Sequence, residues 1–423
     1  MARKSGAIVV AVVAAVSVAA SAVAQNQVFN GSFARNLRGW TQENYMVWSP
    51  VDANDSASSG SLLVVNTFQS NARGIEQCLA GPAIVPGNSY TFGGSIRIPS
   101  GQSTTGWAAV GLRWYDQPAC GGSVLGDQPR AQSEMGVTDN EFHSVEWTGL
   151  APAGAVSAQF VAYATKIEAG GVYVAHLDDL YFGLQGSTTA NPPAVFVPTG
   201  AHLVGYGGVN WRTDVEFHNP TQEPVSIVVD LLKRDQANAS PLRIGDVVAA
   251  GASRRLWDTV YSNFGFEGAA ALRVTPLNGA LSVTSRTYNQ TDNGTYGQFV
   301  PGLPEHEAVL YGEEARLVQL TYDLSTTAGY RTNIGFVSAV NKLMTIEIRL
   351  FDASGASLGT LNYDLQPYEF KQIDKIFRNV TSNAVADGYA ILRTTTPGGR
   401  FFAYAAVIDN ATGDPICVQP ASF

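Results

Sequence analysis

Short segments in which apolar and polar residues alternate, or in which apolar residues run without a break, recur along this chain. Such segments, rich in the β-branched and aromatic residues that favour strands, lie at 226–232, 280–288, 345–351 and 400–408. Gly, Pro, Asn and Asp interrupt them at short intervals, and only brief helical turns are expected, near 257–264 and 373–379. The pattern therefore predicts an all-β protein built of sandwiches and argues against a parallel α/β sheet.

The second half of the chain contains an internal repeat. Residues 211–217 read WRTDVEF and residues 330–336 read YRTNIGF, at a spacing of 119. Four further pairs of blocks follow in the same order: 227–232 with 346–351, 256–260 with 372–376, 271–274 with 391–394, and 287–289 with 407–409. This self-similarity predicts a duplicated domain, with two tandem homologous β-sandwiches at 195–303 and 304–423.

The N-terminus predicts export. Arg3 and Lys4 precede a small apolar run at 7–20, and Ala22-Val23-Ala24 has the small residues of a cleavage site. We therefore expect a signal peptide at 1–24 and a mature chain that is secreted, periplasmic or on the cell surface. No later stretch is long and apolar enough to predict a transmembrane helix.

Composition and charge narrow the class of partner. Without Arg3 and Lys4, 24 Lys and Arg face 35 Asp and Glu, and no basic run is present. Nucleic acid is therefore not an expected partner, because phosphate binding needs clustered basic residues. A chain of 423 residues predicts two or three domains, and the Gly-, Ser-, Thr- and Pro-rich stretch 186–194 predicts a linker after the first.

Three cysteines fit an oxidising compartment. Cys78 and Cys120 both fall in the N-terminal region beside predicted strands, so we expect them to form a disulfide. Cys417 is the odd one, and a buried or idle thiol is favoured there over an intermolecular bridge.

Several motifs of the N-terminal region occur in a characteristic order. They are VFNGSFARNLRGW at 28–40, SGSLLVV at 59–65, PGNSYTF within 85–92, Trp147 followed by APAGA at 151–155, and GVYVAHLDDLYF at 171–182. In this order they resemble the jelly-roll carbohydrate-binding modules, of galactose-binding-like type, that accompany secreted cellulases and xylanases. The resemblance implies a jelly-roll β-sandwich over 26–185 and a polysaccharide ligand. The duplicated half resembles β-sandwich repeats of bacterial secreted proteins, for which it implies architecture and no chemistry.

Sugar binding needs exposed aromatic rings and polar side chains. Trp48 and Tyr45, in an irregular segment, and Trp107, expected in a loop, are candidate ligand contacts, with hydrophobic edge-covering as the alternative. Trp114 and Tyr115 are consecutive in a predicted strand, so one should face a groove beside Arg113 while the other packs inside. Trp40 and Trp147 match motif positions that are usually core.

The same resemblance implies a structural calcium ion where the first and last strands of the module meet. Asp178 and Asp179 match the acids of the closing motif, and oxygen ligands suit this hard cation. Ala34, however, stands where the opening motif usually has Glu. The alternative is that Asp179 caps a turn or accepts hydrogen bonds from backbone amides.

No catalytic motif stands out. The chain lacks H-E-x-x-H, G-x-S-x-G and a phosphate-binding glycine loop, and its cysteines do not have metal-site spacing. Arg212 and Arg331 occupy equivalent places in the two repeats, where a structural role is favoured over anion binding. The sequence predicts a non-catalytic protein that binds extracellular or cell-surface polysaccharide. The alternative is a structural or adhesive surface protein that acts through protein contacts, possible for the tandem half in particular.

Overall fold

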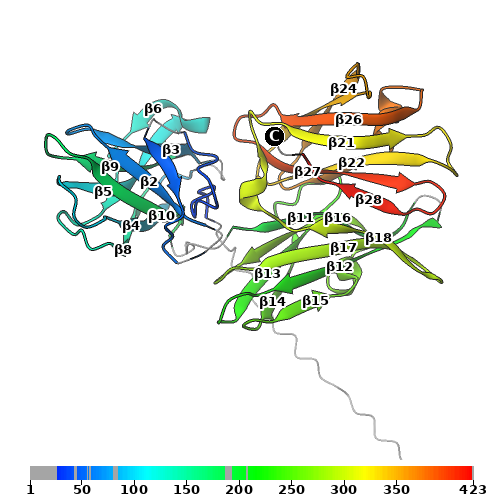
Figure 1. Cartoon of the computed structure of the whole chain (residues 1–423), viewed down its shortest axis with the longest axis horizontal. Helices are drawn as coiled ribbons and strands as arrows, with labels where there is room; N and C mark the ends of the chain where they lie inside the picture. Colours follow the sequence, from blue (N-terminus) through cyan, green and yellow to red (C-terminus); the bar gives the residue numbers. More distant parts are fainter. Residues whose placement is uncertain are drawn as a thin grey trace, which may run out of the picture.

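The structure, a computed structural model, describes residues 26–41, 45–54, 56, 59–79, 84–185, 193–205 and 208–421. Its regular structure is almost entirely antiparallel β-sheet, so the all-β prediction is confirmed. In Figure 1, strands β1–β10 gather on the left, β11–β18 at the lower right and β21–β28 at the upper right. The predicted signal peptide and most of the predicted linker lie outside the described residues. In the described ranges, no helix is long and apolar enough to cross a membrane.

The first ten strands form two sheets that enclose one apolar core. One sheet has the order β1-β2-β10-β4-β8, and the other has the order β3-β9-β5-β6, with β7 beside β5. Their bounds are β1 (Met46–Ser49), β2 (Ser61–Asn66), β3 (Ala72–Cys78), β4 (Ser89–Arg97), β5 (Gly106–Gln117), η1 (Pro118–Cys120), β6 (Gly121–Leu125), β7 (Arg130–Gln132), β8 (Phe142–Leu150), β9 (Ser157–Lys166) and β10 (Tyr173–Leu184).

The core of this sandwich follows from alternation along the strands. In β9, Phe160 and Ala162 are buried, whereas Tyr163 lies on the outer face. In β5, Trp114 is buried and the adjacent Tyr115 points outward, as predicted for consecutive strand residues.

Trp40 and Trp147 also belong to the core side, as expected. Trp40 is buried, and its indole N–H donates to the carbonyl oxygen of Asn30 at 3.3 Å. Trp147 packs on the core with its ring centroid 5.2 Å from that of Phe92.

The predicted disulfide between Cys78 and Cys120 is present, with Cα atoms 5.9 Å apart. It ties the end of β3 to the η1 turn across a sequence separation of 42. Cys417, in β28, is a half-buried thiol whose pKa is raised by burial.

Strands β11–β19 form the next sandwich. One layer has the order β14-β13-β16-β11, and the other has the order β15-β12-β17-β18. Strand β11 joins the two layers, because residues 195–202 pair with β16 and the last two residues of β11 pair with β12. The bounds are β11 (Val195–Val204), β12 (Asn210–His218), β13 (Val225–Lys233), β14 (Leu242–Val248), β15 (Ser253–Leu256), α1 (Thr259–Ser262), β16 (Gly268–Pro276), β17 (Ser282–Thr291), β18 (Gly294–Pro301) and β19 (Leu303–Pro304).

The remaining strands form two sheets around a further core. One has the order β21-β26-β23-β24, and the other has the order β20-β27-β22-β25, with β28 beside β27. The bounds are η3 (Glu305–Glu307), β20 (Val309–Leu310), β21 (Ala315–Tyr322), β22 (Tyr330–Ser338), β23 (Met344–Phe351), β24 (Ser357–Leu365), β25 (Phe370–Ile373), η4 (Ile376–Asn379), β26 (Val385–Thr394), β27 (Arg400–Asp409) and β28 (Pro415–Val418). The short helical turns α1 and η4 lie where the sequence predicted them.

An apolar cluster joins these two sandwiches. Nearly every residue of β22 and β27 is buried, because one face packs inside their own sandwich and the other packs against β11 and β16. At the centre of the contact, the rings of Phe196 and Phe402 lie 5.0 Å apart. The tandem half is therefore one packed unit.

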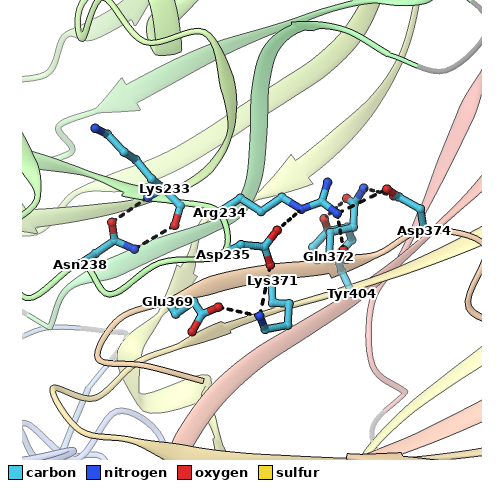
Figure 2. A network of polar contacts seen from close by, with 9 residues as sticks. All are labelled: Lys233, Arg234, Asp235, Asn238, Glu369, Lys371, Gln372, Asp374 and Tyr404. Atoms are coloured by element: carbon cyan, nitrogen blue, oxygen red, sulfur yellow. Dashed lines mark hydrogen bonds and ion pairs between the residues drawn. The ribbon is translucent and has the colours of Figure 1, made fainter. Parts of the chain in front are cut away.

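Polar contacts adjoin this cluster (Figure 2). Arg234 donates to the carbonyl oxygen of Gln372 at 2.6 Å, and Lys371 lies between Asp235, at 3.2 Å, and Glu369, at 2.7 Å. Since Arg234 and Asp235 follow β13 and their partners lie in or beside β25, these contacts fix one sandwich against the other.

The N-terminal sandwich contacts the third one through Arg38. Its guanidinium donates to the carbonyl oxygens of His306 at 3.1 Å and Ala308 at 2.6 Å, and to the carboxylate of Glu313 at 2.8 Å. Burial, then Arg38 and Arg35, lower the pKa of His306 to about 4. Protonation of His306 would add a positive charge beside these arginines and oppose the contact.

The disulfide predicts a measurable stability difference. The double variant Cys78→Ser/Cys120→Ser should lower the free energy of unfolding of the N-terminal sandwich by about 4 kcal/mol, because the unfolded chain gains loop entropy. Denaturant unfolding of the full chain measures this, with Cys417→Ser as the control. If the unfolding transition of the N-terminal sandwich had the same midpoint in the double variant as in the wild type, the stabilising role of the bridge would be contradicted.

The docking contact predicts a pH dependence. The folded-state pKa of His306 lies below its ordinary value of 6.5. The contribution of neutral His306 to folding stability is therefore fully present above pH 6.5 and is lost as the pH falls toward 4. Over this range we expect the free energy of unfolding to fall by roughly 3 kcal/mol more in the wild type than in His306→Gln, because only this difference reports on His306. The control His143→Gln changes an exposed histidine and should keep the wild-type profile. Identical profiles for wild type and His306→Gln would contradict the prediction.

Candidate functional site

A groove runs across the outer face of the sheet that contains β3, β9, β5 and β7. Every second residue of these strands points away from the core, so their outward side chains form its floor and walls. The groove has a volume of about 470 Å³, which is the size of an ordinary small-ligand pocket. Its lining includes Thr41, Glu76, Trp107, Arg113, Arg130 and Tyr163.

Two aromatic rings and a guanidinium form one part of the groove. The rings of Trp107 and Tyr163 meet edge to face, with centroids 5.6 Å apart. The guanidinium carbon of Arg130 lies 4.7 Å from the centroid of the Trp107 ring. Trp107 is the second residue of β5, so its predicted place in a loop is wrong: Gly106 already pairs with Lys166 of β9.

A polar network forms the other part. Arg113 donates to the carboxylate of Glu76 and to the side-chain oxygen of Gln159, both at 2.9 Å. The Tyr115 hydroxyl donates to the same oxygen of Gln159 at 3.1 Å. Arg113 and Tyr115 thus share the outer face, as their spacing predicted, although Tyr115 lies outside the groove itself.

Gly74 shapes the groove floor. A Cβ atom placed there would lie 2.6 Å from Cβ of Tyr163 and 2.0 Å from the carbonyl oxygen of Ala162. The absence of a side chain therefore lets β3 approach β9 closely next to the Tyr163 ring.

Two predicted contacts lie away from the groove. Trp48, in β1 of the opposite sheet, packs against the core, and its indole N–H donates to the carbonyl oxygen of Phe33 at 2.7 Å. Tyr45 is exposed and meets Phe68 edge to face at 6.5 Å. The structure therefore brings Trp107 and Arg113 together and places Trp48 and Tyr45 elsewhere.

Sequence reasoning missed Tyr163 and Arg130. The alternation of Phe160, Ala162 and Ala164 with Val161, Tyr163 and Thr165 could have placed Tyr163 on the outer face. No local signal could have placed Arg130, because its position follows from the pairing of the short strand β7 with β5.

Asp178 and Asp179 form an acidic corner at a bulge in β10. Asp178 is fully buried and accepts hydrogen bonds from the backbone N–H groups of Ala53 at 2.8 Å and Asp179 at 2.7 Å. Burial, and then the neighbouring Asp179, raise the pKa of Asp178 to about 8. Asp179 accepts from the side-chain amide of Asn54 at 2.7 Å.

The alternative named backbone amides as donors to Asp179, but it is Asp178 that accepts from backbone amides, whereas Asp179 accepts from a side-chain amide. Among the described residues, no group of three or more His, Cys, Asp or Glu side chains could hold a metal ion. Two carboxylates supply fewer than the roughly six to eight oxygens that calcium takes. The calcium site therefore stays a prediction, and it would need backbone carbonyl oxygens or water as further ligands.

The repeated arginines contact their own sandwiches. Arg212 lies 3.4 Å from the carboxylate of Asp258, and Arg331 donates to the side-chain oxygen of Asn410 at 2.9 Å. Arg331 also lines a cleft of about 390 Å³ between the two tandem sandwiches, together with Asn289 and Asn410. These contacts match the structural role favoured for both arginines.

No protein-family model and no curated protein sequence matches this chain. Among solved structures, the enzymatically active domain of tailspike protein 4 of bacteriophage CBA120 aligns at 21% identity and a TM-score of 0.30, over 38% of this chain and only 21% of that domain. Family 16 carbohydrate binding module-2 aligns at 15% identity and a TM-score of 0.28, over 37% of this chain and 99% of that module. The tandem CBM22-1-CBM22-2 domain of Paenibacillus barcinonensis Xyn10C aligns at 11% identity and a TM-score of 0.29, over 95% of this chain and 99% of that domain pair.

The acidic corner gives a test of calcium binding. A cation held by Asp178 and Asp179 would favour their ionised forms and relieve the repulsion between them. We expect the melting temperature of the N-terminal sandwich to rise in millimolar calcium and to fall in a chelator, and Asp178→Asn to abolish the difference. Equal melting temperatures of the wild type in both solutions would remove calcium from the account.

Proposed function

We propose that this chain is a secreted, non-catalytic protein that binds extracellular or cell-surface polysaccharide through the groove of its N-terminal sandwich. The observation that carries the proposal is the groove lined by Trp107, Tyr163, Arg113 and Glu76 on the outer face of an antiparallel sheet. Aromatic rings beside hydrogen-bonding side chains are the combination that sugar recognition needs. The motif resemblance of residues 26–185 supports the same ligand class.

The residues have distinct roles in this proposal. The rings of Trp107 and Tyr163 supply apolar surface for the CH groups of a sugar, while Arg113 and Glu76 offer a donor and an acceptor for hydroxyl groups. Because Arg113 and Glu76 already bond to each other, their geometry is set before a ligand arrives.

We also propose that residues 195–303 and 304–423 are duplicated domains, joined by a linker at 186–194 to the first module at 26–185. In this proposal they act as a spacer or surface attachment for that module. The strand order β11-β16-β13-β14 recurring as β21-β26-β23-β24 supports duplication. So does one repeated hydrogen bond: Asp214 accepts from the backbone N–H of Asp258, and Asn333 accepts from that of Lys375, both at 2.9 Å. Asp258 and Lys375 each have a positive φ, which indicates equivalent turns.

The alternative proposal is a structural or adhesive surface protein. The tandem half exposes large apolar side chains, among them Trp257 and Phe299, each 62% exposed, which could contact another protein. The two functions differ in whether the groove or the tandem half contacts the partner.

The groove predicts a retardation experiment. The full chain should be slowed in native gels that contain a soluble polysaccharide it recognises, and Trp107→Ala should weaken binding about tenfold because ring contacts are lost. Tyr45→Ala is the matched control, since Tyr45 is an exposed aromatic residue of the same module outside the groove.

Retardation that survives Trp107→Ala but is lost in Tyr45→Ala would place the site elsewhere. No retardation in a broad polysaccharide panel, from a folded chain with its disulfide intact, would favour the structural or adhesive alternative.

A further inference from the structure

We propose that the groove selects an anionic polysaccharide, one whose sugars carry carboxylate or sulfate groups, over a neutral one. This inference rests on the proposed function and names its ligand class. The observation behind it is the distribution of charge among the groove residues.

The charge of Arg130 is uncompensated. The side chain is exposed, and among the described residues no carboxylate lies within ion-pair distance of it. Arg113, by contrast, is paired with Glu76. Two guanidinium groups and one carboxylate therefore line the groove, leaving a net positive charge in a protein whose overall charge is −9. Such a local reversal of sign attracts an anion.

The position of Arg130 also disfavours a neutral sugar. Its guanidinium covers a face of the Trp107 ring at 4.7 Å, so a neutral pyranose that stacks on that face must displace the cation. An anionic sugar can instead accept hydrogen bonds from the guanidinium where it lies, and such bonds to ionised groups are the stronger kind.

Tyr163 completes the anion-binding arrangement. Burial raises the pKa of its phenol, so the hydroxyl keeps its proton at neutral pH and can donate a hydrogen bond. The guanidinium of Arg130 is close enough to lower that pKa in part, and that of Arg113 adds to this effect. An acidic group of the ligand would therefore meet two kinds of donor in one place.

The test measures binding of the full chain to four polymers: polygalacturonate, its carboxyl-reduced form, dextran sulfate and unmodified dextran. We expect one or both charged polymers to bind at least about tenfold more tightly than their neutral counterparts. The first pair tests carboxylate and the second tests sulfate. Binding to a charged polymer should weaken as NaCl rises, because salt screens the attraction.

Variants assign the effect to one side chain. Arg130→Gln should reduce binding to the charged polymer about tenfold, and Arg130→Glu should abolish it. Arg97→Gln, which changes an arginine on β4 of the opposite sheet, is the matched control and should bind as the wild type does. Because the salt dependence is measured on the wild type, the inference can fail even where a variant does not fold.

Three results would overturn the inference. Equal binding to charged and neutral polymers would reject anion selection and leave polysaccharide recognition standing. Charge-dependent binding that Arg130→Glu leaves unchanged would place the anion outside the groove. If neither these polymers nor a broad neutral panel bound, the inference and the proposed function would both fail.

Discussion

The packing of Phe196 against Phe402 is the contact on which the arrangement of this chain depends. An isolated β-sandwich exposes the outer faces of its sheets to water, yet β22 and β27 are buried on both faces. Separating the tandem sandwiches would expose this apolar surface, so they are expected to remain together. Arg38 then fixes the N-terminal sandwich to the unit through carbonyl groups and Glu313.

The stretch of chain that contains Arg38 also forms part of the groove. Three residues after Arg38, Thr41 exchanges backbone hydrogen bonds with Glu76, and Glu76 in turn holds Arg113. The contact with the tandem half and the edge of the candidate site therefore lie on one short stretch of chain. The disulfide ties down the end of the same strand, β3, at Cys78, two residues beyond Glu76. This end of β3, beside the groove, is consequently held by two restraints before any ligand binds.

Much of the fold could be predicted from the sequence, because strands, turns and the cysteine pair leave local signals. The apolar run 400–408 predicted a buried strand. That its second face packs against the other sandwich could not be predicted, because the period of a strand does not identify its tertiary partner. Within the proposed repeat, one block was aligned one residue out of register: Val215 faces Leu256 and Ile334 faces Ile373, so Leu256 would correspond to Ile373 and not to Gln372. At the site, Trp107 and Arg113 were within reach of the sequence, whereas Arg130 reaches the groove only through tertiary strand pairing.

Hydroxyl-radical footprinting of the full chain, with and without a polysaccharide panel, tests the central claim most directly. If the groove binds the polymer, oxidation of Trp107 and Tyr163 should fall on binding. Tyr45, 57% exposed, and Trp257, 62% exposed, should be oxidised as before, because neither lines the groove. Protection of Tyr45 or Trp257 with unchanged oxidation of Trp107 and Tyr163 would contradict the account.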